Sequence, residues 1–242
     1  MKKLSKTNEL LWLLGIIFVA FGVAICSKAN LGVSMIAAPA FIIYEAIAPL
    51  WSGFSVGMTE YLIQGVILIV LCIIIRKFRW TFLLAFLVAL IYGYTLDFFI
   101  WVLKDVSFDA VWLRWLMLLV GDVIVAFGVA CFFKTYMPLQ VYELFVSEIS
   151  KKFSMNIPKV KMFFDYSLLA ISLILAFTLF GDVKTFDWST IGYSSFHNIG
   201  LGTIVTTMIN SPIIALMSKL LDLTFNPTPL IPKLESFLKK QG

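Results

Sequence analysis

Six long apolar stretches constrain the fold of this chain more than any other feature of its sequence. A helix needs about 20 apolar residues to cross the hydrocarbon core of a bilayer, and each stretch is long enough. Hydrophobic residues make up 61% of the chain and charged residues only 14%, so a soluble core could not bury this much apolar surface. The sequence therefore predicts an all-α membrane protein with about six transmembrane helices. The stretches cover about residues 9–27, 57–75, 81–103, 113–134, 162–181 and 197–221.

Two shorter apolar segments, about 33–49 and 138–152, decide the topology. Proline or carboxylates interrupt both of them. If neither crosses the bilayer and the N-terminus is cytoplasmic, the Arg76–Arg79 cluster and most other cations face the cytoplasm, as the positive-inside rule requires. If the first segment crossed, alone or with the second, that cluster would be exported. We therefore expect both segments to form short re-entrant or interfacial helices. This topology leaves outside only Lys28, Lys104, Arg114 and Lys184, and it places inside Lys2, Lys3, Lys6, Lys134, Lys151, Lys152, Lys159, Lys161 and the C-terminal lysines.

An internal repeat divides the chain into two similar halves. The hexapeptide Val19–Ala24 recurs identically as Val125–Ala130, and a lysine follows at the same distance in each copy. Chance repetition among apolar residues is the alternative to duplication. Three spans per half is an odd number, so the second half is expected to have inverted topology. We predict one membrane domain over 1–242, with repeat 1 at about 9–104, repeat 2 at about 113–222 and a cytoplasmic tail at 223–242.

Several short motifs resemble those of the YczE-type bacterial membrane proteins, which are distantly related to the YitT type. The motifs are Lys28-Ala-Asn-Leu-Gly-Val-Ser34, Gly53-Phe-Ser-Val-Gly57 and Ile199-Gly-Leu-Gly-Thr-Ile204, in the same order as in that family. The chain departs from the family where Met35 and Ile36 replace its Pro-Trp, and where Pro138 alone remains of a Pro-Arg-Asp-Gly-like run. The resemblance implies a bacterial transporter of poorly defined substrate, with a link to vitamin B6 metabolism in some members.

Ionisable and polar residues inside the spans are the candidate site, because such groups are costly in a bilayer and tend to face the bundle interior. Asp122 lies about ten residues into the fourth span, and Glu60 and Gln64 share one face of the second. The alternative for Asp97, Glu60 and Asp165 is solvation or helix capping at the interface. The full set of candidate substrate-binding residues is Asp122, Glu45, Asn30, Ser34, Tyr92, Asp97, Glu60, Gln64, Asp165, Asn210 and Ser211.

Three of these candidates carry further expectations. The resemblance places an acidic residue at Asp165. The run Asn210-Ser211-Pro212 is expected to interrupt the last span and form a polar niche, or else to be a simple packing kink. The single histidine, His197, is expected at the membrane interface, while Lys28 and Lys134 either neutralise carboxylates or extend to the headgroups.

The function predicted from these features is secondary transport of a small cationic, amine or vitamin-like solute by alternating access. Proton coupling through a carboxylate is one way to drive it. No nucleotide-binding loop, zinc motif or nucleophile elbow occurs, so we expect no enzymatic activity and no cofactor or metal. The net charge of +5 is not clustered, which argues against nucleic acid. The expected location is a bacterial inner membrane with both termini cytoplasmic.

Two other functions stay open. Ala20 and Ala24, and their copies Ala126 and Ala130, place small residues on one helix face. Vitamin-capture subunits of energy-coupling-factor transporters dock a partner through a similar alanine face, so the chain could be the capture subunit of a multi-subunit importer with an energising partner. A membrane scaffold or regulatory protein is the third class. Expected partners are the lipid bilayer, the small-molecule substrate and either a second copy of the chain or an energising subunit.

Overall fold

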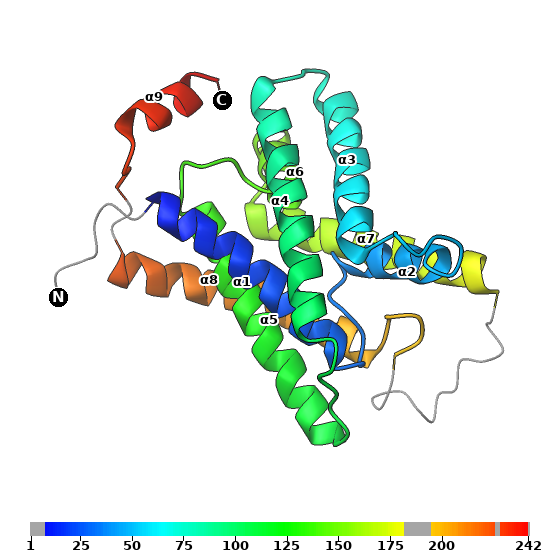
Figure 1. Cartoon of the computed structure of the whole chain (residues 1–242). Coiled ribbons are helices and arrows are strands. Elements are labelled where there is room, and N and C mark those ends of the chain that lie inside the picture. Colours follow the sequence, from blue (N-terminus) through cyan, green and yellow to red (C-terminus); the bar gives the residue numbers. More distant parts are fainter. Residues whose placement is uncertain (1–7, 182–194, 226–227, 242) are drawn as a thin grey trace.

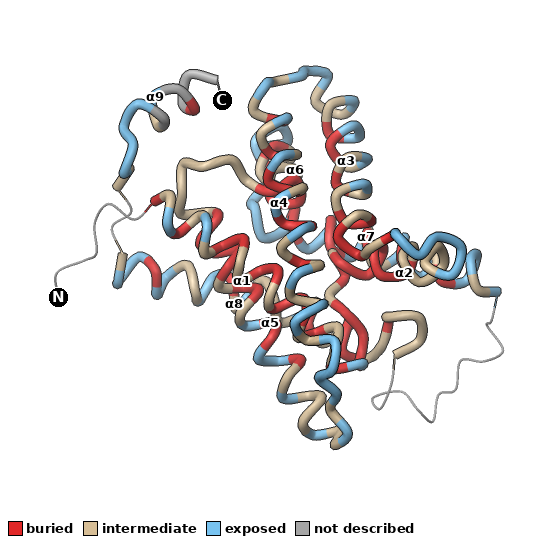
Figure 2. Tube along the Cα trace, in the orientation of Figure 1, coloured by how far each residue is buried: buried red, intermediate tan, exposed pale blue. Residues whose placement is uncertain are grey.

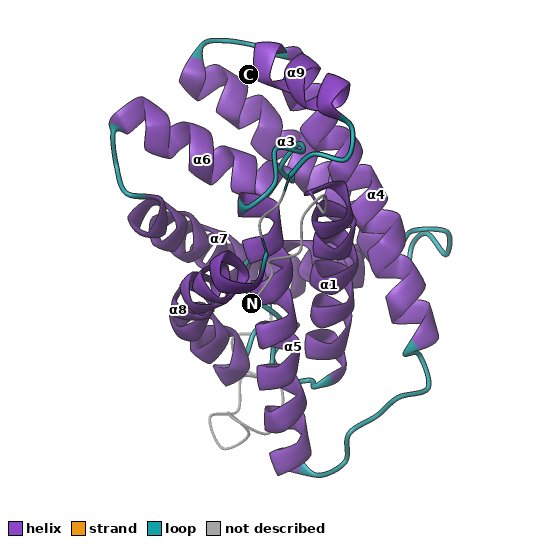
Figure 3. Cartoon of the chain, turned by 90° about the vertical axis from the view of Figure 1, so that its left-hand side faces the viewer, coloured by secondary structure: helices purple, strands orange, loops and turns teal. Residues whose placement is uncertain are grey.

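The computed structural model describes residues 8–181, 195–225 and 228–241, and these parts are helical, with no strand drawn in Figure 3. Six helices are long and apolar enough to cross a membrane, as the sequence predicts, and the chain is a multi-pass membrane protein. They are α1 (Asn8–Lys28), α3 (Val56–Ile75), α4 (Trp80–Val102), α5 (Val111–Phe133), α7 (Ile157–Phe180) and α8 (Leu201–Thr224). Three shorter helices are α2 (Ala38–Ile47), α6 (Val141–Phe153) and α9 (Pro232–Gln241).

The helix ends follow local sequence signals. At the start of α3, the Ser55 hydroxyl accepts the amide of Met58 at 3.1 Å, and Arg76 ends the helix in the left-handed conformation. Proline stands in the first turn of α7, where its missing N–H costs nothing, and Gly181 ends that helix with φ of 66°. Local sequence therefore explains where these two spans begin and end.

The crossing of α1 and α5 lies at the centre of the protein (Figure 1). A Cβ atom on Gly22 would lie 2.6 Å from the carbonyl oxygen of Gly121, and one on Gly15 would lie 3.1 Å from that of Gly128. Small residues at both points allow the two backbones to touch, as is usual between helices in a bilayer. The crossing is antiparallel, because the earlier glycine of each helix faces the later glycine of the other.

The remaining helices surround this pair. Helix α4 packs on α1 and α3, and α8 packs on α5, while α2 and α6 each lie against both α3 and α7. Buried residues concentrate on the inward faces (Figure 2), while many Leu, Ile, Phe and Trp side chains stay exposed on the outward faces. A lipid environment provides the partner for these exposed apolar side chains.

Helices α2 and α6 are too short to cross a bilayer, as the sequence predicts. At 1.5 Å per residue, the 10 residues of α2 and the 13 of α6 extend about 15 and 20 Å, less than the roughly 30 Å of a hydrocarbon core. Each begins among buried residues and ends at the surface, with Lys151 and Lys152 exposed at the end of α6. A chain that enters a bilayer and returns on the same side has this pattern.

Helix α8 continues through Asn210-Ser211-Pro212 to Thr224, so the predicted break is wrong, while the alternative of a packing kink stays a prediction. Pro212 is exposed on the outer side of the helix, where its ring meets little packed protein. Transmembrane helices tolerate proline because neighbouring groups satisfy the freed carbonyl. Four cations used in the topology prediction (Lys2, Lys3, Lys6 and Lys184) lie outside the described residues.

Candidate functional site

Polar side chains from six helices meet in the interior of the protein. All of them are buried except Asn210, which is half-buried. Hydrogen bonds and electrostatic interactions connect them across helix boundaries, and an ion pair joins two of them within α7. We call this set the central cluster: Glu60 and Gln64 of α3, Tyr92 of α4, Asp122 of α5, Tyr142 and Glu143 of α6, Lys161 and Asp165 of α7, and Asn210 of α8.

Glu60 joins α3 to the short helix α6. The Tyr142 hydroxyl donates a hydrogen bond of 2.8 Å to Glu60 Oε2, and both residues are almost fully buried. Gln64 lies one turn further along α3, close enough to influence the Glu60 carboxylate, although neither atom of its amide reaches hydrogen-bonding geometry. Tyr92 of α4 also interacts electrostatically with Glu60. Two aromatic rings and an amide therefore surround this carboxylate.

Lys161 brings the one cation of the central cluster. Its ammonium lies 3.3 Å from the carboxylate of Asp165, one turn along α7, and both side chains are buried. The same ammonium is close enough to interact electrostatically with Glu143 and Asp122. Three carboxylates therefore lie near Lys161, and it forms an ion pair with one of them.

Asp122 lies midway along α5 and faces α8. Asn210 Nδ2 donates a hydrogen bond of 2.8 Å to Asp122 Oδ1. Gly121 beside it forms part of the close contact with α1, which positions this turn of α5 at the centre of the bundle. Asp122 thus lies at the midpoint of a span and is only 1% exposed.

Five polar atoms of the central cluster have no hydrogen-bond partner within the protein. They are Glu60 Oε1, Gln64 Oε1, Gln64 Nε2, Asp122 Oδ2 and Glu143 Oε2, and no other buried side-chain nitrogen or oxygen in the described parts of the chain lacks a partner. Leaving a buried polar group unsatisfied costs about 1–3 kcal/mol. Because these atoms gather in one place, the cluster has the chemistry of a solute or water site and not of packed core.

The charge of the central cluster is unbalanced. Glu60, Asp122, Glu143 and Asp165 supply four carboxyl groups, against the single ammonium of Lys161. An excess of buried carboxyl groups can hold protons, bind a cation, or exchange one for the other. The cluster therefore has the electrostatics of a cation or proton site.

Several residues predicted for the site lie elsewhere. Glu45 on α2 binds the connection before α8, through His197 Nδ1 at 2.8 Å and Asn198 Nδ2 at 2.9 Å, and Asn30 accepts the Ser195 hydroxyl at 2.8 Å. These contacts form a separate polar network at the far ends of α1 and α7. The prediction missed this network because nothing local in the sequence indicates that residues 195–198 pack there.

Asp97, Ser34 and Ser211 also lie outside the central cluster. Asp97 caps the start of α3, where Oδ1 accepts the amide of Gly57 at 2.7 Å and Oδ2 accepts the Ser55 hydroxyl at 2.6 Å. The carbonyl of Ser34 accepts the amides that begin α2, while Ser211 is half-buried on α8. For Asp97 the capping alternative is therefore correct.

Sequence analysis did not include three members of the cluster among its candidates, namely Tyr142, Glu143 and Lys161. Lys161 had been assigned to a cytoplasmic loop, but α7 begins at Ile157 and carries it inside the bundle. Its spacing of four residues from Asp165 was the available signal, since side chains so spaced meet on a helix. Lys28 and Lys134 do not belong to the central cluster. Lys28 donates to the Lys104 carbonyl, and Lys134 forms an ion pair with Asp222.

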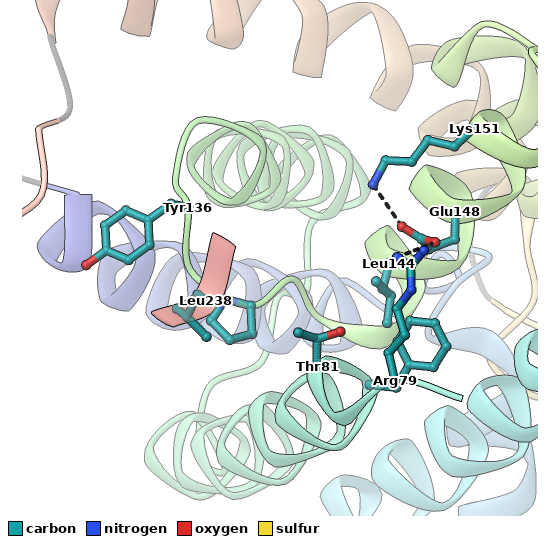
Figure 4. A pocket seen from close by; sticks show the side chains of 9 residues that line it. Arg79, Thr81, Tyr136, Leu144, Glu148, Lys151 and Leu238 are labelled. Carbon is teal, nitrogen blue, oxygen red and sulfur yellow. Dashed lines mark hydrogen bonds and ion pairs between the residues drawn. The ribbon is translucent and has the colours of Figure 1, made fainter. Parts of the chain in front are cut away.

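A cleft lies apart from the central cluster, between the start of α4, α6 and α9 (Figure 4). This cleft holds about 200 Å³, and Leu238 of α9 closes one side of it. Its two cations, Arg79 and Lys151, both pair with Glu148, at 3.4 and 2.8 Å, so one carboxylate neutralises one of the two positive charges.

The C-terminal segment near this cleft is tied to the start of α1. Glu9 accepts the backbone amides of Leu230 and Ile231, both at 2.9 Å, and it also accepts the Tyr136 hydroxyl. Burial and this contact with the Glu9 carboxylate raise the pKa of Tyr136 well above its ordinary value. Tyr136 therefore stays protonated and serves as a donor that anchors the segment.

Six helices of membrane length around a buried, charged cluster define a multi-pass α-helical membrane protein with an internal polar site. The chain belongs to a family of unknown function (DUF6198), whose model matches residues 6–219 and so includes the whole central cluster. No curated protein and no solved structure matches this chain.

Proposed function

We propose that this protein is a secondary transporter of a small cationic solute, such as an amine or a vitamin-like amine. The observation that carries the proposal is the central cluster, which contains four buried carboxyl groups, one lysine and five polar atoms without protein partners. Buried ionisable groups in membrane helices commonly mark ion or substrate pathways. Protons are the natural coupling ion, because a carboxyl group can exchange a proton for the solute.

Two inverted repeats would provide alternating access. Gly22 and Gly128 occupy the same place in the two copies of the hexapeptide, and each is preceded by a glycine seven residues earlier. The contacts Gly15–Gly128 and Gly22–Gly121 exchange with each other when one copy replaces the other, as a two-fold axis in the membrane plane requires. Helix pairs support the same relation, since α1 on α4 corresponds to α5 on α8, and α2 on α7 to α6 on α3.

One pair of helices in each half does not follow this two-fold relation. The difference supports a conformation whose central cluster is accessible from one side of the membrane. Helices α3 and α4 form a close hairpin with Gly57 against Gly93, whereas the corresponding helices α7 and α8 make few contacts. In alternating access, the two halves exchange these arrangements. We propose that the separation of α7 and α8 belongs to one of the two access states.

We further propose a bacterial inner membrane as the location, with both termini cytoplasmic. Arg76, Lys77 and Arg79 between α3 and α4, and Lys151 and Lys152 at the end of α6, would then face the cytoplasm. The proposed relation to YczE-type proteins agrees with this location. This relation does not indicate a substrate, because the chain departs from the family motifs at Met35 and Ile36 and after Pro138.

The alternative of a vitamin-capture subunit meets one obstacle in the structure. Its docking face would be the alanines of the first helix, but Ala20, Ala24, Ala126 and Ala130 are all fully buried at the α1–α5 contact. They are therefore not available to a partner in this conformation. A scaffold protein, the third class, has no use for the unpartnered atoms of the central cluster.

A thermal-shift screen of the purified protein against amines, vitamins and amino acids tests the proposal. A ligand that binds the folded state stabilises it and so raises the apparent Tm. At a ligand concentration of 100 times Kd, the stabilisation is about 2.7 kcal/mol. A cationic ligand should stabilise the wild type and the control Glu45→Gln, which lies outside the central cluster, but not Asp122→Asn. Stabilisation that survives Asp122→Asn and Glu60→Gln equally would move the site elsewhere, and no hit at all would favour a partner-dependent or scaffolding role.

A further inference from the structure

Lys161 carries a charge that the proposed cation site would have to accommodate. It is 6% exposed, and no other lysine or arginine in the described parts of the chain is classed as buried. Burying an ammonium in a membrane protein is expensive, and a single ion pair seldom repays the cost. Its pair with Asp165 is long at 3.3 Å, so this contact alone gives a weak reason for placing a lysine here.

Lys161 also interacts electrostatically with carboxylates on two other helices. Glu143 and Asp122 interact with it electrostatically from α6 and α5, and each has a carboxylate oxygen without a hydrogen-bond partner. The lysine side chain has four flexible methylene groups, so its ammonium can move between acceptors on different helices. Glu143 and Asp122 therefore have fewer hydrogen-bond donors around them than they can accept. The ammonium of Lys161 is the one charged donor group available to them in the central cluster.

We propose that Lys161 is a tethered internal cation that competes with the transported solute for the carboxylates of the central cluster. When the solute binds Glu143, Asp122 and Glu60, the lysine is confined to Asp165. When the solute leaves, the lysine ammonium compensates the vacated carboxylates, so the empty cluster can change access without bare buried charge. This inference rests on the proposed function and names the chemistry of its substrate.

The unpartnered atoms define that chemistry further. Glu60 Oε1, Asp122 Oδ2 and Glu143 Oε2 are acceptors, so the solute that satisfies them must present several N–H donors. Gln64, fully buried, offers both a donor and an acceptor that no protein group uses, and the rings of Tyr92 and Tyr142 provide apolar faces. A primary ammonium or a guanidinium on a small apolar or aromatic body fits these groups. A quaternary ammonium has the same charge but no N–H donor, and it leaves the acceptors unsatisfied.

The test measures binding of benzylamine, phenylguanidine and benzyltrimethylammonium to the full-length protein by thermal shift and equilibrium titration. The first two ligands should bind, and the quaternary ion should bind at least about tenfold more weakly, because it leaves the buried acceptors unsatisfied. Equal binding of benzylamine and benzyltrimethylammonium would overturn the requirement for N–H donors.

Substitution of the lysine tests the competition. Lys161→Met keeps the length of the side chain and removes its charge, so benzylamine should bind about tenfold more tightly, whereas a purely structural lysine predicts weaker binding. Lys161→Met leaves the buried Asp165 without its ion-pair partner, which could prevent folding. The double variant Lys161→Met/Asp165→Asn removes both members of the pair and should still bind benzylamine more tightly than the wild type. Lys159→Met, on the exposed first turn of α7, is the matched control and should change nothing.

The failures are distinguishable. If Lys161→Met and the double variant bind benzylamine no better than the wild type, the competition is wrong while the cation site stands. If no cation binds the wild type or either variant, the proposed function fails, and this inference fails with it.

Discussion

The contact between α1 and α5 makes a quantitative prediction for Gly22→Ala. The new Cβ would lie 2.6 Å from the Gly121 carbonyl oxygen and 2.9 Å from the Val125 amide nitrogen, both backbone atoms that cannot rotate away. Overpacking a tight contact costs about 1–3 kcal/mol, and two backbone contacts place this site at the upper end. Alanine favours a helix by about 0.5–1 kcal/mol over glycine, which leaves a net loss of about 2 kcal/mol.

This loss should be visible as a fall in apparent Tm during thermal unfolding of the purified protein in detergent. About 1 kcal/mol corresponds to 2–4 °C for a chain of this size, so we expect a fall of roughly 4–8 °C. Gly128→Ala, the counterpart in the second repeat, meets Gly15 and Val19 at 2.7–2.9 Å and should fall by a similar amount. Gly65→Ala is the control, because its nearest neighbour is the Phe86 ring at 3.3 Å.

Two results would refute this reasoning. If Gly22→Ala unfolds at the same temperature as Gly65→Ala, the two helix backbones do not touch as described. If Gly22→Ala is strongly destabilised and Gly128→Ala is not, the crossing lacks the two-fold relation on which the inverted repeat depends.

Three further substitutions have defined outcomes. Asp97→Ala removes the side chain that accepts the Gly57 amide, so it should lower stability by about 0.5–2 kcal/mol in the same unfolding assay, with the Kd for benzylamine unchanged. Tyr142→Phe removes the hydroxyl that donates to Glu60 and should cost about 1–3 kcal/mol, with a changed ligand affinity by titration. Pro212→Ala should leave stability unchanged or raise it, because α8 is already continuous there; a loss of binding would instead show that the proline shapes the site.

The spans could be predicted closely because bilayer thickness sets their length and apolarity. The two short helices were also predictable, since proline or carboxylates interrupt both apolar segments, while the topology inferred from Arg76 and its neighbouring cations stays a prediction. The prediction for the last span was less accurate. The run Asn210-Ser211-Pro212 predicts a break, but the helix continues through it. Composition reports where a helix can lie in a bilayer, but not whether neighbouring helices support a proline within it.

The candidate site could be predicted only in part. Asp122 lies far enough inside its span for depth alone to indicate a buried position. Glu60 lies near the start of its span, and the available signal was that it shares a helix face with Gln64. Lys161 was missed because it stands at the edge of an apolar stretch, where hydropathy cannot tell a loop from a first helical turn. Glu45 was included because of its short helix, but a contact with His197 from a distant segment determines its place.

Solute-dependent proton movement in proteoliposomes that contain the purified protein and a trapped pH-sensitive dye tests the central claim most directly. Benzylamine added outside should change the internal pH faster in the wild type and in Glu45→Gln than in liposomes without protein. This protein-dependent rate should fall at least tenfold in Glu60→Gln, at equal reconstitution and unchanged apparent Tm, because that change removes a carboxyl group from the central cluster. Equal rates in Glu60→Gln and Glu45→Gln, or the same rate in liposomes without protein, would contradict the account.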